Sequence, residues 1–243
     1  MAAILEVVNI TKHFGGLRAL YNCSLDIHEG EVLGLIGPNG SGKTTLFNII
    51  VNLYLPDGGH ILFKGKKIEG LQPYHVARLG IGRTFQDVKT FSNLTVIENM
   101  IIAGMVRKTE STGQRAHDLL TMFGLDYLAE EYSKNLSFGQ QRLLEFAMSL
   151  MPDPEFLMLD EPAAGVHPGI QNKMLELIKS LRGKGKTFLL IEHNTDFVAR
   201  CSDRVVVLNQ GEKLAEGKPE IVWENPDVIK AYLGRSRTSA SGT

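Results

Sequence analysis

A glycine-rich stretch in the first quarter of the chain carries the residue types that bind phosphate groups. It is Gly37-Pro38-Asn39-Gly40-Ser41-Gly42-Lys43-Thr44-Thr45, and it matches the pattern G-x-x-x-x-G-K-[ST] at every fixed position. The apolar run 32–36 predicts a buried strand before it, and residues 44–53, which contain no glycine or proline, predict a helix after it. This strand-loop-helix order predicts a site for a nucleoside triphosphate.

The chemistry of such a site follows from the residue types in the loop. Glycines allow the backbone to curl so that its N–H groups point at phosphate oxygens, and the start of the following helix adds a partial positive charge. We expect Lys43 to reach the β- and γ-phosphates of ATP, and Thr44 to offer its hydroxyl to Mg²⁺. The alternative is an ordinary glycine-rich turn with a surface lysine, which the flanking strand and helix disfavour.

Two acids at the end of an apolar run form the second group. Residues 156–159 predict a buried strand, and Asp160 and Glu161 follow it directly. Ligands of α/β proteins bind at the carboxyl ends of such strands. We expect Asp160 to hold Mg²⁺, directly or through water, and Glu161 to orient and polarise the attacking water. Acids at a strand end can also cap a helix or face solvent, but next to a phosphate loop the catalytic roles are favoured.

The third group is Leu136-Ser137-Phe138-Gly139-Gln140, followed by a helix predicted over residues 141–150. Ser137 suits the N-cap of that helix. The stretch also resembles the L-S-x-G-Q signature of ABC-type ATPases. It lies after the phosphate loop and before the acidic strand, as in that family. The chain therefore resembles an ABC nucleotide-binding domain over residues 5–234.

The resemblance implies roles for three further residues. Phe14 falls where an aromatic ring stacks on adenine, and the alternative is a core phenylalanine. Gln86 matches the glutamine that contacts Mg²⁺ and water, and the alternative is a surface amide in a loop. His193 matches the switch histidine that hydrogen-bonds the γ-phosphate, and the alternative is a structural histidine at a strand end. Glu161, His193 and Gln86 are the expected catalytic set.

The resemblance also implies an assembly. In the family the signature serine and its neighbouring N–H groups bind the γ-phosphate held by the opposite subunit. We therefore expect a dimer with a second ATP-binding subunit, either a copy of this chain or a paralogue. His167 stands where aspartate is usual, in the loop that couples the two sites, so the strength of that coupling is open.

The predicted fold is α/β, a P-loop NTPase of the ABC type with a RecA-like parallel-sheet core, an antiparallel β layer and an α-helical subdomain. Residues 1–234 form the single expected domain, with the helical subdomain at about 87–150, and a disordered tail follows at 235–243. The expected strands are 4–10, 24–27, 60–63, 81–85, 156–159, 187–191 and 204–208, and the other expected helices are 73–79, 169–181, 194–201, 221–224 and 226–233.

Composition narrows the class and the compartment. A net charge of −1 and a pI near 6.7 give no sign of a nucleic-acid surface, so no nucleic-acid partner is expected. Cys23 and Cys201 are expected to be buried apolar residues in a reducing compartment. With no apolar run of about 18 residues and no signal segment, we expect a cytoplasmic protein. The resemblance to ABC ATPases implies that it reaches the cytoplasmic face of the inner membrane through two transmembrane permease subunits.

Finer features resemble the ATPases of branched-chain amino acid importers, in their G-type subgroup. They are Phe14-Gly15-Gly16-Leu17, Arg83-Thr84-Phe85-Gln86, Thr95-Val96-Ile97-Glu98-Asn99, Glu161-Pro162-Ala163-Ala164-Gly165 and the ending 225–234. ATPases of lipopolysaccharide or lipid export are the alternative, since they share the Tyr-Leu-Gly ending. An ABC ATPase that acts on DNA or ribosomes is disfavoured by the single domain and the net charge. A catalytically dead domain is disfavoured because the catalytic residues are present.

Overall fold

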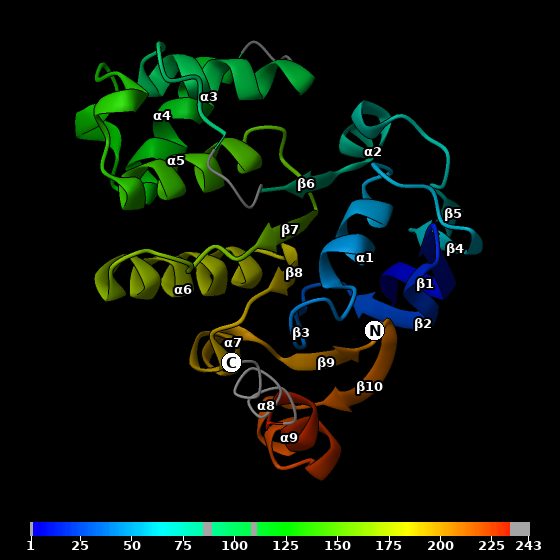
Figure 1. Cartoon of the computed structure of the whole chain (residues 1–243). Coiled ribbons are helices and arrows are strands. Elements are labelled where there is room, and N and C mark those ends of the chain that lie inside the picture. Colours follow the sequence, from blue (N-terminus) through cyan, green and yellow to red (C-terminus); the bar gives the residue numbers. More distant parts are fainter. Residues whose placement is uncertain (1, 85–88, 108–110, 234–243) are drawn as a thin grey trace.

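The structure, a computed structural model, describes residues 2–84, 89–107 and 111–233. At its centre lies a six-stranded sheet in the order β10-β9-β3-β8-β7-β6 (Figure 1). All neighbouring strands are parallel except β10, which runs antiparallel to β9. The strands are β3 (Val32–Ile36), β6 (Ile81–Arg83), β7 (Phe156–Asp160), β8 (Thr187–Ile191), β9 (Arg204–Asn209) and β10 (Glu212–Gly217).

The four inner strands are buried on both faces, which explains their continuous apolar runs. Side chains alternate between two cores: Phe188 and Leu190 of β8 pack into one, and Leu189 and Ile191 pack into the other. The predicted parallel α/β core is therefore confirmed. Both cysteines are buried, as expected, and burial raises the pKa of the Cys201 thiol to about 12.

One core lies between the central sheet and a second, antiparallel sheet in the order β2-β1-β4-β5. Its strands are β1 (Ala3–Phe14), β2 (Leu17–His28), β4 (Gly58–Phe63) and β5 (Lys66–Lys67), and helices α1 (Lys43–Ile50) and α2 (Pro73–Leu79) adjoin them. β1 and β2 are longer than the apolar pattern predicted. Polar residues on their outer face extend the hairpin to the turn at Gly15 and Gly16, where no apolar alternation marks a strand.

The helical region forms a lobe that stands apart from the antiparallel sheet (Figure 1). It consists of α3 (Val96–Gly104), α4 (Thr112–Phe123) and α5 (Phe138–Leu150), with 3-10 turns η1 (Met105–Arg107), η2 (Asp126–Leu128) and η3 (Ser133–Asn135). The rings of Phe123 and Phe146 meet edge to face in its core, with centroids 5.2 Å apart. We call α3, α4 and α5, together with η1, η2 and η3, the helical lobe.

The start predicted for α5, residue 141, was three residues too late. Ser137 accepts a hydrogen bond from the N–H of Gln140, and the Gln140 side chain accepts one from the N–H of Ser137. This reciprocal pair, a capping box, starts the helix at Phe138. The apolar pattern did not indicate this start, because Gly139 lies in the first turn of the helix.

Helices α6 (Pro168–Gly183), α7 (Thr195–Cys201), α8 (Pro219–Trp223) and α9 (Pro226–Leu233) complete the fold. The bounds predicted for α2, β8 and α9 are confirmed. β10 was not predicted, because it is a polar edge strand with only β9 beside it. Phe85, predicted to end β6, lies outside the described residues. Within the described residues, no helix has the length and hydropathy needed to cross a membrane.

Candidate functional site

A cleft of about 470 Å³ opens at the carboxyl ends of β3, β7 and β8. It brings together three groups that are far apart in the sequence: the phosphate loop, the acid after β7 and the histidine after β8. Its lining is Phe14, Leu17, Arg18, Ala19, Asn39, Gly40, Ser41, Gly42, Lys43, Thr44, Thr45, Glu161 and His193. Phe14, the phosphate loop from Asn39 onward, Glu161 and His193 thus meet in one place. Arg18 and Ala19 of β2 also line the cleft, but they belong to no motif and were not predicted. Leu17 was noted only as part of Phe14-Gly15-Gly16-Leu17, with no role in the site.

The glycine loop has the backbone that the motif predicts. Gly37 has a φ of 148°, and a Cβ there would lie 2.1 Å from the carbonyl oxygen of Leu208. Gly42 has a φ of 106°, and a Cβ there would lie 2.7 Å from the carbonyl oxygen of Ala19. Neither position admits a side chain. The loop therefore packs against the end of β9 and against β2, and α1 begins directly after it.

Lys43 lies along this loop and is 5% exposed. Its Nζ donates to the carbonyl oxygens of Gly37, at 2.7 Å, and Pro38, at 3.1 Å. The Ser41 hydroxyl is buried and has no hydrogen-bond partner within the described residues. A buried hydroxyl without a partner is unfavourable by about 1–3 kcal/mol. The loop thus contains a buried cation and an unused hydroxyl, which fit an anionic ligand rich in acceptor oxygens.

Asp160 ends β7 and is only 6% exposed. Burial, with the negative charge of Glu161 beside it, raises the pKa of Asp160 to about 6. The cations Lys43, Arg142 and Arg83 oppose this rise without cancelling it. The carboxylate is therefore under-neutralised in its site, which favours a bound cation.

Glu161 and His193 touch each other across the cleft. Glu161 Oε1 and His193 Nε2 lie 2.8 Å apart. The N–H of Glu161 donates to the carbonyl oxygen of Ile191, which joins the ends of β7 and β8. Glu161 has a φ of 47°, a left-handed conformation that is strained for a residue with a side chain. Sequence reasoning chose both residues but not their contact, because the order of strands in the sheet decides it.

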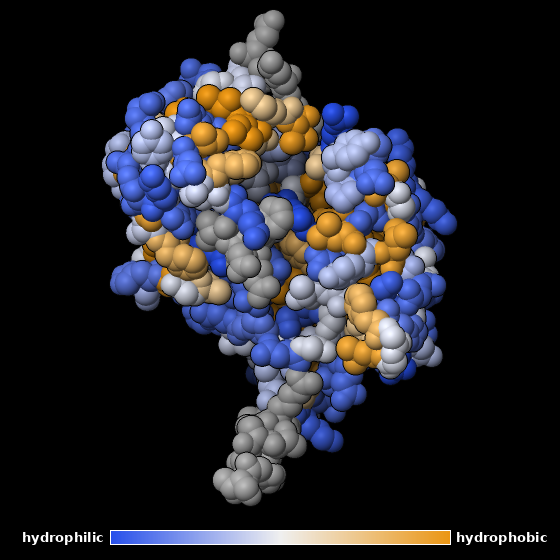
Figure 2. Space-filling view, turned by 45° about the horizontal axis from the view of Figure 1, so that its top comes forward, coloured by the Kyte–Doolittle hydropathy of each residue, from blue (hydrophilic) through white to orange (hydrophobic). Residues whose placement is uncertain are grey.

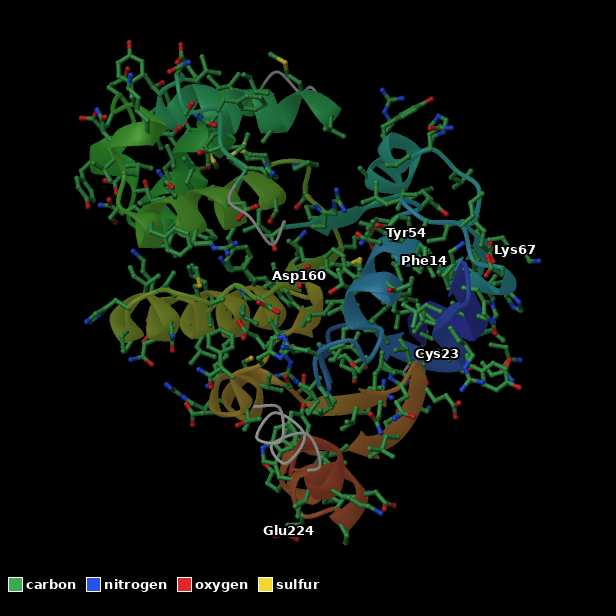
Figure 3. The ribbon with its side chains drawn as sticks, viewed as in Figure 1. Phe14, Cys23, Tyr54, Lys67, Asp160 and Glu224 are labelled. Carbon is green, nitrogen blue, oxygen red and sulfur yellow. The ribbon has the colours of Figure 1, made fainter. Side chains whose placement is uncertain are left out.

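Phe14 ends β1 at the rim of the cleft and is 42% exposed. The alternative of a core phenylalanine is therefore wrong. Tyr54 lies beside it, with ring centroids 5.3 Å apart in an edge-to-face arrangement (Figure 3). Tyr54 was not predicted, since no motif includes it and 40 residues separate it from Phe14 in the sequence.

The signature residues, Leu136 to Gln140, do not line this cleft within the described part of the chain. They start α5 on the helical lobe, where the Ser137 hydroxyl donates to Gln140 Oε1 at 2.9 Å. The N-cap role of Ser137 is confirmed. Its role toward a second subunit stays a prediction.

Two further predicted positions are Gln86 and His167. Gln86 lies outside the described residues. His167 is the N-cap of α6, and its Nδ1 accepts a hydrogen bond from the N–H of Gly169 at 3.1 Å. Aspartate commonly provides such an acceptor at a helix N-cap. Histidine can thus replace the usual aspartate here without leaving the helix start uncapped.

Comparison with known proteins decides the family. The family model described as "ABC transporter" matches residues 20–164. The chain belongs to the ABC transporter family. A second family model, described as "Branched-chain amino acid ATP-binding cassette transporter", matches residues 212–237, which include β10, α8 and α9. The family predicted from the three motifs is therefore confirmed.

Individual relatives agree with this membership. The chain is 43% identical to the high-affinity branched-chain amino acid transport ATP-binding protein LivG of Salmonella typhimurium, over 96% of this chain and 98% of that protein. It superposes on the ADP conformation of MJ1267, an ATP-binding cassette of an ABC transporter, with a TM-score of 0.90, 34% identity and coverage of 96% and 100%. It also resembles a dimeric post-hydrolysis state of the cassette MJ0796 bound to ADP and Pi, with a TM-score of 0.80, 29% identity and coverage of 88% and 98%. The predicted cassette fold is confirmed.

Proposed function

We propose that this chain binds and hydrolyses ATP as the ATP-binding subunit of a transporter that imports branched-chain amino acids. The observation that carries the proposal is the contact between Glu161 and His193, 2.8 Å apart, in the same cleft as the phosphate loop. The amino acid cargo is supported by the relative LivG and by the family model that matches residues 212–237. Lipid or lipopolysaccharide export, which the shared Tyr-Leu-Gly ending suggested, has no such support.

Phosphate binding follows from the loop. The N–H groups of residues 39–45 and the start of α1 face the triphosphate. Lys43 exchanges its bonds with the carbonyls of Gly37 and Pro38 for phosphate oxygens, a charge-assisted hydrogen bond that is stronger than the neutral one. Ser41 gives the phosphates its buried, unpartnered hydroxyl. Phe14 stacks on the adenine ring.

The oxygen donors of the cleft suit Mg²⁺, which prefers carboxylate, hydroxyl and water ligands. Thr44, whose side chain is exposed at the start of α1, and Asp160 would hold the ion, together with Gln86 outside the described residues. A bound Mg²⁺ would offset the charge that develops on the phosphate oxygens. It would also keep Asp160 ionised, because a nearby cation lowers the pKa of a carboxylate.

Hydrolysis then depends on Glu161. Its carboxylate orients a water molecule toward the γ-phosphate and accepts a proton from it, as a general base within hydrogen-bond reach. His193 leaves Glu161 and donates from Nε2 to the γ-phosphate. The contact between the two side chains in the free chain thus keeps both beside the place where the γ-phosphate binds.

A second subunit completes the site. Within the described residues, the signature residues do not line the cleft of their own chain, and the related cassette MJ0796 was solved as a dimer. We propose that Ser137 and the N-terminus of α5 bind the γ-phosphate held by a second ATP-binding subunit, either a copy of this chain or a paralogue. Loss of that phosphate removes contacts that only the closed dimer makes, so the dimer opens.

The permease partner has a candidate surface. A groove of about 330 Å³ lies between the helical lobe and α2, with Val76, Ala103, Val106 and Met148 in its mainly apolar lining. Hydrophobic residues, orange in Figure 2, lie on both parts of the molecule around the hollow between them. We propose that a cytoplasmic segment of each of two permease subunits binds here and places the chain on the inner membrane. We propose that Gln86 and the neighbouring segment through Leu94 transmit the opening and closing of the dimer to the permease. The whole chain would act as one domain over residues 1–234.

The test of hydrolysis is Glu161→Gln. We expect kcat for ATP hydrolysis to fall by at least about 100-fold, because the base is lost, while the Kd for ATP changes less than about threefold. Wild-type turnover should be low for the isolated chain and rise with protein concentration, because the site is shared. If the Glu161→Gln variant hydrolysed ATP at the wild-type rate, the catalytic assignment of Glu161 would be wrong.

Affinity purification of the tagged chain from its own cells tests the transport role. We expect two permease proteins to co-purify, and uptake of leucine to fall when the chain carries Glu161→Gln. Recovery of lipid-export components, ribosomes or DNA would contradict the proposed cargo.

A further inference from the structure

Glu192 is a buried carboxylate that the proposed reaction steps do not use. It directly follows β8, whose five residues are all buried, and it is itself 2% exposed. Burial raises the pKa of Glu192 above its usual range, and the backbone N–H groups that donate to it act in the opposite direction. A buried ionised carboxylate is unfavourable unless its hydrogen bonds compensate. Those hydrogen bonds therefore show what the side chain holds in place.

The carboxylate of Glu192 accepts hydrogen bonds from two loops of the cleft. Its Oε1 accepts from the N–H of Ala163 at 2.7 Å, in the loop that follows Glu161. Its Oε2 accepts from the N–H groups of His193 and Asn194, at 3.2 and 3.5 Å. One side chain thus joins the loop after β7 to the loop after β8.

These are the loops that present Glu161 and His193 to each other. Glu161 is strained, with a φ of 47°, and such a conformation persists only when its surroundings fix it. Ala163 is two residues further on, so its bond to Glu192 fixes the turn that contains the strain. The 2.8 Å contact between the side chains of Glu161 and His193 depends on the same spacing of the loops.

We infer that Glu192 is a positioning residue that holds Glu161 and His193 in register for hydrolysis. The inference rests on the proposed ATPase function and deepens it. Glu192 acts through its two neighbours and through backbone N–H groups, not on ATP itself. Loss of either tie lets the base and the histidine move apart, and small displacements of catalytic groups slow a reaction strongly.

Two variants remove the tie in different ways. In Glu192→Gln the side chain keeps only one oxygen that can accept a hydrogen bond. Its NH₂ group then faces a backbone N–H of one of the two loops, and two donors cannot bond to each other. In Glu192→Asp the shorter side chain can still accept from residues 193 and 194, as aspartate often does locally, but does not reach Ala163. For both variants we expect kcat for ATP hydrolysis to fall about tenfold, with the Kd for ATP within twofold of wild type.

Glu31 offers a matched control, because it is also a buried carboxylate, 8% exposed, that accepts from a backbone N–H. It lies at the opposite end of the sheet, before β3. Glu31→Gln should lower the melting temperature and leave kcat unchanged. If the Glu192 variants also lose melting temperature but keep kcat, Glu192 is a structural residue and the inference is overturned.

A double-mutant cycle with His193→Ala separates positioning from an independent effect, in single-turnover assays. Once His193 is absent, Glu192→Asp should reduce the remaining rate by clearly less than the tenfold expected in the wild-type background, because only Glu161 is left to position. If Glu192→Asp lowered the rate of the His193→Ala variant by the full tenfold, the positioning role of Glu192 would be overturned and the proposed ATPase function would not. Absence of hydrolysis by the wild-type chain would overturn the proposed function, and the inference with it.

Discussion

The two ends of the parallel sheet bury charged side chains in opposite ways. At the amino end, Arg204 donates to both oxygens of Glu31, at 2.8 and 3.1 Å. Burial alone would raise the pKa of Glu31, but these bonds and the N–H of His28 lower it overall. A single, solvent-exposed ion pair joins Arg182 to Asp203, at 2.6 Å. At this end the buried Glu31 and the exposed Asp203 each face a cation.

At the carboxyl end, three acids gather around the cleft: Asp160, Glu161 and Glu192. Burial raises the pKa of Asp160 and of Glu192, and the charge of Glu161 adds to both. The sheet is therefore stabilised by its charges at one end and destabilised by them at the other. Such an excess of unfavourable groups is typical of a functional site, because a ligand can relieve it.

The largest expected effect, a weaker binding of ATP, follows from removing the Lys43 cation at the carboxyl end of the sheet. Lys43→Ala removes the buried ammonium that we propose binds the phosphates, so the Kd for ATP should rise about 100-fold, or about 2.7 kcal/mol. Isothermal titration calorimetry measures it. Lys67, exposed on β5 and away from the cleft, provides the control (Figure 3). Equal losses in Lys43→Ala and Lys67→Ala would mean that general charge, not the loop, attracts ATP.

The ion pairs of the amino end should matter for stability only. Glu31→Gln removes a charge from the pair with Arg204, and we expect about 2 kcal/mol less unfolding free energy in urea at pH 7.5. Because the folded-state pKa of Glu31 is lowered, its contribution is present above the unfolded pKa and is lost as the pH falls through the folded pKa. The difference between variant and wild type should therefore shrink in acid. A drop in ATPase rate would contradict this separation of the two ends.

Sequence motifs could predict the groups at the carboxyl end but not how they meet. The phosphate loop, Asp160, Glu161 and His193 were found because their types follow short apolar strands at recognisable positions. The contact of Glu161 with His193 could not be found, because it needs β7 and β8 to be neighbours in the sheet, which the local pattern does not specify.

Glu192 was missed for a related reason, since it directly precedes His193 and its three bonds are made to backbone groups. The one local signal was an acid at the end of a buried strand. The ion pair between Glu31 and Arg204 at the amino end could not be predicted either, since the two residues are 173 positions apart in the sequence. Tertiary pairings of this kind have no local signature.

Neutralising an acid at the carboxyl end should have the opposite effect to Glu31→Gln. Asp160→Asn should raise the unfolding free energy of the nucleotide-free chain by about 1–2 kcal/mol at pH 8, because a raised pKa means that the folded state disfavours the charge. The folded pKa is about 6 and the usual value is 3.8, so the penalty is complete above about pH 6 and fades as the pH falls toward 4. Urea unfolding at pH 8 and pH 5 measures this.

Asp126→Asn, at an exposed position on the helical lobe, is the control for that experiment and should change little. A less stable Asp160→Asn chain would mean that the nearby cations already neutralise Asp160. The comparison between the two ends would then fail at its central residue.

The smallest effect is expected where the cleft uses no charge at all. Phe14→Ala removes the ring that we propose stacks on adenine, and the Kd for ATP should rise about fivefold, or about 1 kcal/mol, with kcat unchanged. Phe14→Tyr keeps the ring and should bind like wild type. Inorganic triphosphate, which has no base, should bind wild type and Phe14→Ala equally well, whereas Lys43→Ala should bind it poorly. If Phe14→Ala weakened both ligands alike, the ring would act on the shape of the loop rather than on adenine.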